Sequence, residues 1–187
     1  MAMVWGLTGR YRLPSTFSIR FENMGSGSYR LTTSQVLPVS PEKAFIFFED
    51  PRNLFEITPD WLDFRMVDAG SMTAVHEGAM FDYTIRWFGV PFRWRGRIAD
   101  YHPPDRFTDI QDIGPYRSWV HLHSFKTLPG GTLMEDTVDY RVPFGLVGCL
   151  AHRLLVRRQL QDIFCYRAVR IREWVTGNFR PKGRCGG

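Results

Sequence analysis

The sequence has few cysteines and no long hydrophobic run. Its 187 residues include three cysteines, Cys149, Cys165 and Cys185, and no C-x-x-C pair. An odd and scattered set of cysteines argues against a disulfide framework and against a zinc knuckle. No apolar stretch approaches the roughly 20 residues that a transmembrane helix needs. We therefore expect a protein of a reducing, cytoplasmic compartment, with no integral membrane association.

The central part of the chain also lacks an excess of charge of either sign. The formal net charge is +5, but residues 29–175 hold equal numbers of basic and acidic residues. The excess comes from residues 1–28 and 176–187 at the two ends. A nucleic-acid-binding protein gains most of its affinity by neutralising phosphates with a basic folded body. We therefore expect no nucleic-acid partner.

Common cofactor and nucleophile motifs are missing as well. The chain contains no G-x-x-x-x-G-K phosphate loop, no G-x-G-x-x-G dinucleotide motif and no Ser-His-Asp signature. These motifs supply the backbone donors and activated nucleophiles on which phosphoryl transfer, nicotinamide chemistry and serine catalysis depend. We therefore expect no cofactor.

The composition is that of one folded domain with two ends of different character. Hydrophobic residues make up 44% and aromatic residues 15% of the chain, which is enough to bury a core without disulfides or metal. Residues 1–28 show no sustained periodicity. We interpret them as a disordered arm, a start site placed too far upstream, or an Arg-rich targeting peptide. Residues 29–177 form the predicted domain and 178–187 a basic flexible tail.

Local patterns predict helices on either side of a long run of strands. Ser40 and Pro41 supply an N-cap and a first-turn proline for one helix, and a second short helix follows at 53–57. A long helix covers about 146–175. The predicted strands are 30–38, 61–68, 77–88, 91–101, 106–113, 117–128 and 132–142.

This order of elements predicts an α+β fold. Six successive strands with short turns indicate an antiparallel meander rather than βαβ units. We expect a curved antiparallel sheet of about seven strands, wrapped around the long C-terminal helix, with two short helices after the first strand. Such an arrangement encloses space between sheet and helix, where ligands bind.

One predicted hairpin carries most of the chemistry. Gly130-Gly131 tolerates the positive φ angles of a type I′ turn. Pairing Pro129 with Thr132 places Phe125 opposite Asp136, and Asp136 diagonal to His123. The predicted inward-facing residues of the two strands include Trp119, His121, His123, Phe125, Asp136, Val138 and Tyr140.

Two histidines and an aspartate on an inward face allow three interpretations. Asp136 could orient His123 as a general base. The three residues could instead be hydrogen-bonded groups that line a pocket, or satisfied core residues. A metal ion would need two or three converging ligands, and the sequence places no third His or Cys beside His121 and His123. We therefore predict no metal site.

Three arginines fall within the apolar arc of the last helix when its residues are placed at 100° steps. They are Arg153, Arg157 and Arg167. A buried guanidinium is costly unless it is paired, so each must find an anion or water, or extend to the rim. Asp136 is an available partner, and we expect at least one of the three arginines to face the pocket.

Four stretches of the sequence share the pattern of one known family. They are Pro38-Val-Ser-Pro41-x-x-Ala44-Phe45, Gly114-Pro115-Tyr116-Arg117-Ser-Trp119-Val-His121-Leu-His123-Ser-Phe125, Asp136-x-Val138-x-Tyr140-x-Val142-Pro143-Phe144-Gly145 and Arg158-Gln-Leu160-x-x-Ile163-Phe164. Together they resemble the SRPBCC superfamily, the START-like group that includes polyketide cyclases, pollen allergens and coenzyme Q-binding proteins. The resemblance covers about residues 30–177 and looks closest to the small bacterial ligand-binding SRPBCC proteins.

The resemblance implies the helix-grip fold of that superfamily, but it does not imply one function, because this scaffold hosts carriers, cyclases and hydrolases. Relatives carry an acid before the glutamine in the strand that precedes Gly-Pro, whereas here Ile110 precedes Gln111. A role for a carboxylate at that position is therefore not implied for this chain.

We expect the chain to bind a mostly hydrophobic small molecule, lipid-, polyketide- or quinone-like, in a cavity between the sheet and the C-terminal helix. The alternative is a cyclase, aldol-type or hydration enzyme in which a cavity histidine is the general base, with His121, His123 and Asp136 as catalytic candidates. A third hypothesis is an interaction module with an exposed apolar patch. The predicted ligand-binding residues are Trp94, Trp119, His121, His123, Phe125, Asp136, Val138, Tyr140, Arg153, Arg157, Leu160 and Phe164.

Overall fold

The structure is a computed structural model that describes residues 11–67, 75–87 and 89–182. Its strands are β1 (Ser18–Gly25), β2 (Ser28–Leu37), β3 (Arg65–Met66), β4 (Met80–Trp87), β5 (Val90–His102), β6 (Arg106–Ile113), β7 (Ser118–Leu128) and β8 (Gly131–Arg141). Its helices are α1 (Pro41–Glu49), α2 (Pro51–Glu56), the 3-10 helix η1 (Asp60–Leu62), α3 (Gly145–Ala151), the π-helical turn η2 (His152–Val156) and α4 (Arg157–Val175).

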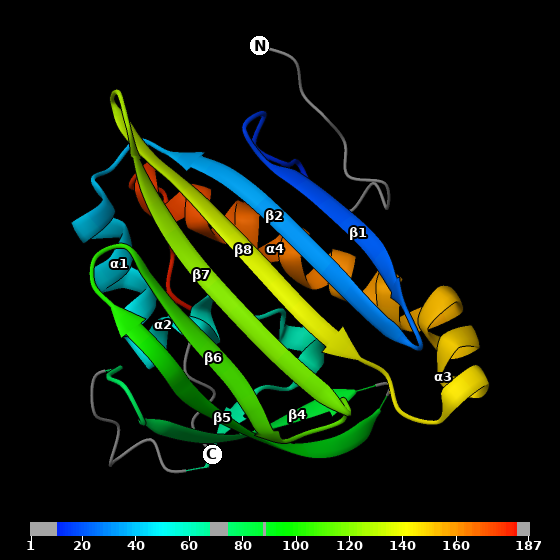
Figure 1. Cartoon of the computed structure of the whole chain (residues 1–187). Helices are drawn as coiled ribbons and strands as arrows, with labels where there is room; N and C mark the ends of the chain where they lie inside the picture. Colours follow the sequence, from blue (N-terminus) through cyan, green and yellow to red (C-terminus); the bar gives the residue numbers. More distant parts are fainter. Residues whose placement is uncertain (1–10, 68–74, 88, 183–187) are drawn as a thin grey trace.

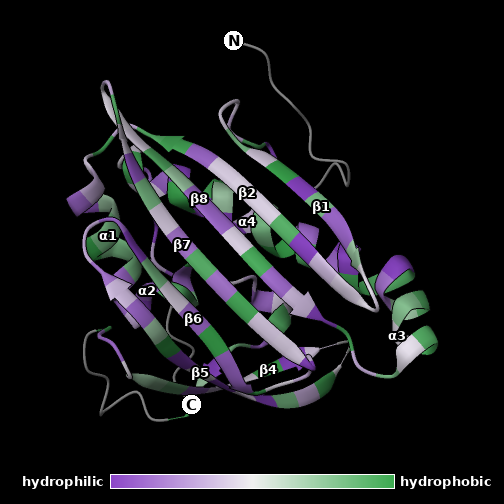
Figure 2. Cartoon of the chain, in the orientation of Figure 1, coloured by the Kyte–Doolittle hydropathy of each residue, from purple (hydrophilic) through white to green (hydrophobic). Residues whose placement is uncertain are grey.

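The strands form one sheet in the order β1-β2-β8-β7-β6-β5-β4-β3, and all neighbours are antiparallel. The sheet is strongly curved, and α4 crosses it behind β2 and β8 (Figure 1). Along β7 and β8, hydrophobic and hydrophilic residues alternate (Figure 2), because successive side chains of a strand point to opposite faces. The predicted α+β fold is confirmed.

The helix starts follow the local sequence signals. Ser40 caps α1 by accepting a hydrogen bond from the Lys43 amide, and Pro41 occupies the first turn. Asp50 caps α2 in the same way, with its carboxylate accepting from the Arg52 amide. The last helix runs without a break through α3, η2 and α4, close to its predicted bounds. Within the described ranges, none of the helices combines the length and the hydropathy of a membrane span.

The core has two parts on the concave face of the sheet. Phe45 of α1 packs edge-to-face against Phe107 and Phe125 of the sheet, and Phe47 packs against Trp174 at the end of α4. The second part lies under the first half of α4. Its largest members are Leu31, Trp94, Trp119, Tyr140, Leu160 and Phe164.

The N-terminal segment differs from the sequence expectation. Residues 18–25 lie within the predicted arm, yet they form β1, the edge strand that pairs with β2 from Ser18 opposite Ser34 to Gly25 opposite Ser28. Disorder is therefore the wrong interpretation for this strand. Residues 1–10 of the same segment lie outside the described residues.

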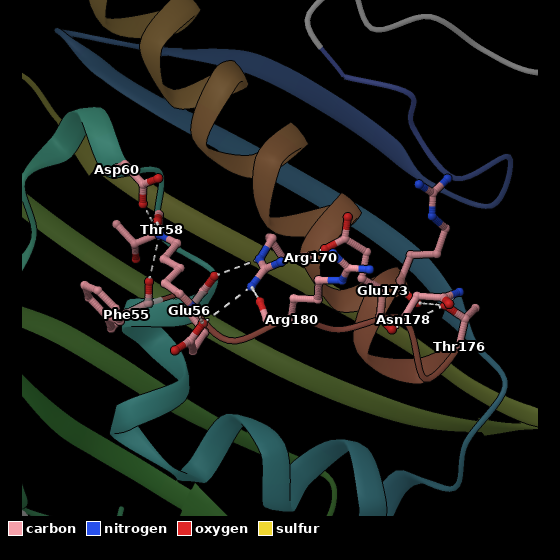
Figure 3. A network of polar contacts seen from close by, with 11 residues as sticks. Phe55, Glu56, Thr58, Asp60, Arg170, Glu173, Thr176, Asn178 and Arg180 are labelled. Carbon is pink, nitrogen blue, oxygen red and sulfur yellow. Dashed lines mark hydrogen bonds and ion pairs between the residues drawn. The ribbon is translucent and has the colours of Figure 1, made fainter. Parts of the chain in front are cut away.

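The beginning of the C-terminal tail is also attached rather than flexible. Arg170 of α4 donates to the backbone oxygen of Arg180, and it pairs with Glu56 of α2 and with Glu173 (Figure 3). Lys182 donates its backbone N–H to Glu56 Oε2 and forms an ion pair with Asp60 at 2.7 Å. These contacts attach Arg180 to α4, and Lys182 to α2 and η1. The rest of the predicted tail, residues 183–187, lies outside the described residues.

Most of the segment 61–68, which the sequence predicts as a strand, does not form one. Its start belongs to the 3-10 helix η1, and only Arg65 and Met66 pair as a strand. Asp63 ends η1 in the left-handed conformation with φ +43°, which an aspartate tolerates better than most residues. Residue 68 lies outside the described residues.

Candidate functional site

A cavity of about 190 Å³ lies between the sheet, the α1–α2 region and α4. Phe48, Leu54 and Ile57 line it from the helices, and Leu160 and Phe164 line it from α4. Trp94, Trp119 and Phe107 contribute from the concave face of the sheet. The walls are therefore mainly aromatic and aliphatic.

The β7–β8 register explains how the polar residues meet. Leu128 pairs with Gly131 and His123 with Asp136, so the turn is Pro129-Gly130 and not Gly130-Gly131. Proline followed by a glycine at φ +82° fits a type II turn. The predicted register was therefore wrong by two residues. Because side chains alternate with a period of two, the inward-facing set is unchanged, but Asp136 lies directly opposite His123.

A second aspartate, on the strand at the other side of β7, lies beside the same two histidines. Asp109 of β6 pairs with His121, and Phe107 pairs with His123. Asp109, His121 and His123 all line the cavity, and among the described residues they are the one set of three His, Cys, Asp or Glu side chains with ligand atoms within 4.8 Å of one another. Two strands flanking β7 thus deliver one carboxylate each to the two imidazoles.

The four side chains make four nitrogen–oxygen contacts. Asp109 Oδ2 lies 3.5 Å from His121 Nδ1 and 3.2 Å from His123 Nε2. Asp136 Oδ1 lies 3.1 Å from His121 Nε2 and 2.9 Å from His123 Nδ1. The last contact is short but not aligned as a hydrogen bond. Asp136 is held in place by Thr33, whose hydroxyl donates to Asp136 Oδ2 at 3.0 Å.

The charges of the cluster follow from burial and from these contacts. Burial alone would raise the pKa of Asp136, but the hydrogen bond from His121 and the contact with His123 hold this pKa well below its ordinary value. The same competition lowers the pKa of Asp109. Burial and the neighbouring His123 lower the pKa of His121, whereas the two carboxylates overcome burial and raise the pKa of His123. Both aspartates are thus carboxylates in the folded protein.

Three further polar groups face the same space. Arg167 of α4 is buried and lines the cavity, and its Nε has no hydrogen-bond partner among the described residues. The indole Nε1 of Trp94 is likewise buried and unpaired within that part of the chain. Burial and then the charge of Asp109 raise the pKa of Tyr83 well above its ordinary value, so its phenol keeps its proton. The cavity thus offers donors that the described residues do not themselves satisfy.

The predicted ligand-binding residues divide into two groups. Six of them line the cavity: Trp94, Trp119, His121, His123, Leu160 and Phe164. The other six do not: Phe125, Asp136, Val138, Tyr140, Arg153 and Arg157.

Each exclusion has a physical reason. Phe125 is covered by Phe45 and Phe48 of α1. Tyr140 lies under η2, where its hydroxyl and His152 Nε2 are 2.8 Å apart, and Val138 is covered in the same part of the core.

Asp136 lies behind the two histidines rather than at the cavity wall. Arg153 and Arg157 are exposed, and the guanidinium of Arg157 lies over the ring of Phe21. Of the three arginines on the predicted apolar arc, Arg167 is the one that faces the cavity.

Asp109 is not among the predicted site residues. The sequence predicts the strand 106–113 but not its register with 117–128. The alternation of Phe107 and Asp109 along this strand is the signal that indicates an inward-facing carboxylate.

Solved structures with the same architecture were found at low sequence identity. No protein-family model matches the sequence, and no curated protein matches it. Protein TTHA0849 from Thermus thermophilus superposes with a TM-score of 0.61 at 18% identity, covering 79% of this chain and 97% of that one. A protein from Arthrobacter aurescens gives a TM-score of 0.62 at 10% identity, covering 91% and 97%.

Ara h 8.0201 gives a TM-score of 0.55 at 15% identity, covering 81% of this chain and 100% of that one. The chain has the helix-grip fold. At these identities the likeness concerns the fold, and the chemistry of the helix-grip cavity has to be argued from the residues of this chain.

Proposed function

We propose that this helix-grip protein binds a small, mostly apolar molecule that carries one oxygen-bearing group. The observation that supports this most is Arg167, a buried arginine that lines a mainly apolar cavity. Its guanidinium lies 4.9 Å from the centroid of the Phe164 ring, and its Nε has no hydrogen-bond partner among the described residues. A buried donor without an acceptor costs about 1–3 kcal/mol. A ligand that supplies an acceptor oxygen would remove that cost.

The size of the cavity limits which ligands can fit. Its volume of about 190 Å³ is below the roughly 300–1,000 Å³ of pockets for drug-sized molecules. It is slightly above the roughly 150 Å³ of an engineered cavity that binds benzene. Among lipid-, polyketide- and quinone-like molecules, this volume favours one or two fused rings over a long acyl chain.

The polar end of the cavity sets the orientation. Arg167 and the Trp94 indole N–H are donors without partners among the described residues, and the Asp109 carboxylate is an acceptor. A carboxylate or carbonyl oxygen of the ligand would face Arg167 and Trp94. The aromatic body would lie against Phe164 and Trp119, whose rings supply contact area at little entropic cost.

Calorimetric titration with a matched pair of ligands tests this. 2-Naphthoate and 2-naphthol have the same bicyclic body, and only the first carries a carboxylate. We expect both to bind with one site per chain. The variant Arg167→Met should lower the affinity for 2-naphthoate by about tenfold to a hundredfold, the usual loss for one charge-assisted hydrogen bond. Its affinity for 2-naphthol should change little. Equal losses for both ligands would contradict the assigned orientation.

Gly96 offers a way to fill the cavity. It lines the wall, and a Cβ built on it would lie 3.8 Å from Trp94 Nε1, an ordinary contact. Gly96→Val should therefore keep the fold and abolish binding of both ligands. Val120→Ile on the exposed face of β7 is the matched control and should bind normally. Unchanged binding by Gly96→Val would show that the ligand lies elsewhere.

A second candidate function is proton abstraction. It is supported by His123, which lines the cavity and lies within 3.2 Å of two carboxylates. A histidine held by a carboxylate on one ring nitrogen is a common general base. A bound substrate that displaces Asp109 from His123 Nε2 would leave this nitrogen free to accept a proton.

Hydrogen exchange of a bound ketone tests the base without knowledge of the substrate. 2-Tetralone has the bicyclic size that the cavity favours and acidic protons next to its carbonyl. If His123 is a base, the protein should accelerate exchange of these protons with deuterated water, and His123→Gln should abolish the acceleration. Acceleration that survives His123→Gln and His121→Gln would exclude both histidines.

A further inference from the structure

The two cavity histidines present one ring nitrogen each to the same carboxylate oxygen on the cavity side. His121 Nδ1 and His123 Nε2 lie 3.5 Å and 3.2 Å from Asp109 Oδ2. Ligand atoms around a tetrahedral ion with bonds of about 2.0–2.1 Å lie about 3.3 Å apart. These two separations are thus close to those between corners of a tetrahedral metal site, and the ligand atoms of the three residues all lie within 4.8 Å of one another.

The opposite nitrogens of both rings point to a second carboxylate. His121 Nε2 and His123 Nδ1 converge on the single oxygen Asp136 Oδ1, and Thr33 occupies the other oxygen of Asp136. Metal-bound histidines almost always present their remote N–H to a carboxylate or carbonyl in this way. This is a second observation, independent of the three cavity-side atoms.

We propose that Asp109, His121 and His123 bind a divalent first-row transition-metal ion, and that Asp136 orients the two histidines from behind. Two nitrogens and one carboxylate oxygen suit Zn²⁺, Co²⁺ or Fe²⁺ better than Mg²⁺ or Ca²⁺, which prefer oxygen ligands alone. The remaining coordination positions face the cavity. The proposal goes beyond the small-molecule function and does not depend on it.

Titration of the chelator-treated protein with Zn²⁺ and Co²⁺ tests the site. We expect one equivalent to bind, with the intense visible absorption of four-coordinate Co²⁺. Asp109→Asn and His121→Gln should weaken binding by at least about a hundredfold, and Asp136→Asn, which removes only the outer contact, by about 10–100-fold.

The control is His102→Gln. His102 lies 2.8 Å from Asp100 in an exposed pair that resembles a cavity His–Asp pair in composition only, and this variant should bind metal like the wild type. The proposal is overturned if the wild type binds no metal, or if Asp109→Asn and His121→Gln, shown by circular dichroism to be folded, bind as tightly as the wild type. Gly96→Val separates this proposal from the proposed function, because this variant should no longer bind 2-naphthoate but should still bind Zn²⁺.

A different part of the molecule carries an independent observation. Six large hydrophobic side chains at the start of the last helix, here called the helix-end patch, are between 50% and 89% exposed. They are Phe144, Leu146, Val147, Leu150, Leu154 and Leu155. The segment α3 projects beyond the edge of the sheet (Figure 1). Contiguous exposed apolar surface of this kind marks an interaction site.

The charge next to the patch identifies the partner. Residues 140–161 contain no Asp or Glu, and Arg153, Arg157 and Arg158 are exposed beside the patch. Leu146 and Leu150 are four residues apart in α3 and share one face of that helix. A helix with an apolar face and arginines beside it lies in the interface of an anionic bilayer. We infer that the helix-end patch docks on a membrane surface that contains anionic lipid.

Vesicle sedimentation tests the docking. The three arginines predict roughly a hundredfold tighter binding to vesicles of phosphatidylcholine with phosphatidylserine than to phosphatidylcholine alone. Leu146→Glu with Leu150→Glu should abolish binding, and Ile46→Glu, at an exposed hydrophobic side chain of α1, should not. Absence of binding by the wild type would overturn the inference. So would a concentration-dependent dimer that the double variant abolishes, since the patch would then be an interface between two copies.

Discussion

Replacement of Asp136 by Asn tests whether the buried cluster stabilises the fold as the contacts imply. Asp136 is 2% exposed. It accepts from Thr33 and His121, and its Oδ1 lies 2.9 Å from His123 Nδ1. Asparagine has the same shape but only one acceptor oxygen and no charge. The substitution thus leaves the buried imidazoles beside an N–H₂ group or without a partner.

The magnitude follows from burial. Removing one partner from a buried charged network costs about 3–5 kcal/mol, because the remaining groups stay desolvated. Asp139, three residues further along β8, provides a matched control. It makes two hydrogen bonds of 2.7 Å with Arg30, but both side chains are at least 40% exposed. Exposed pairs contribute about 0–1 kcal/mol, so Asp139→Asn should cost that much.

Urea denaturation at neutral pH, followed by tryptophan fluorescence, measures both losses against the wild type. The expected order is wild type close to Asp139→Asn, with Asp136→Asn much less stable. If Asp136→Asn and Asp139→Asn differ by less than about 1 kcal/mol, the buried network described here does not exist in solution.

Three further predictions concern other elements. Burial and then the charge of Arg157 lower the pKa of His152 to about 4. As the pH falls, the imidazole therefore binds a proton in the unfolded chain before it does so in the folded protein. The free energy of unfolding, measured by urea titration, should fall by about 2 kcal/mol between pH 7 and pH 4.5, and it should fall less in His152→Gln. Gly148→Ala should cost about 2 kcal/mol or more in the same assay, because its Cβ would lie 1.8 Å from the Pro143 oxygen, whereas Gly96→Ala makes only ordinary contacts and should be neutral. Arg170→Met should release the tail shown in Figure 3 and speed tryptic cleavage after Lys182 by about tenfold; an unchanged rate would mean that Arg170 does not hold it.

The sheet and the long helix were predictable because their signals are local and periodic. Alternation in 117–128 and 132–142 located the inward face correctly even though the hairpin register was wrong by two residues, since a shift of two preserves the face. The sequence allows two positions for the turn, because Gly130-Gly131 fits a type I′ turn and Pro129-Gly130 fits a type II turn. Proline at the first central position decided between them.

The edge strand β1 was missed for a different reason. Its side chains are exposed or only partly buried, so it carries no strong hydrophobic alternation. Only its pairing with β2 identifies it as a strand. A pattern that depends on a partner strand cannot be read from one segment alone.

Arg153 was misplaced because the helix is not uniform. A wheel with 100° steps assumes an α-helix throughout, but His152–Val156 forms a π-helical turn. A wider turn rotates the residues within and before it relative to α4, so Arg153 points to solvent. Arg157 lies in α4 itself, so the turn does not explain its exposure; its guanidinium lies over the ring of Phe21. Arg167, further along α4, keeps its predicted inward position.

Asp109 required tertiary information of another kind. Its neighbours in space, His121 and His123, lie on the next strand, and the loop between the two strands fixes no register by itself. The candidate site depends on the pairing of β6, β7 and β8, and the hairpin signal in the sequence relates only β7 and β8.

The crystal structure of the complex with 2-naphthoate tests the central claim most directly. The account predicts one ligand between the sheet and α4, with its rings against Phe164 and Trp119 and its carboxylate on Arg167. A cavity closed by those side chains, or a ligand bound elsewhere with Arg167 still unpaired, would contradict it.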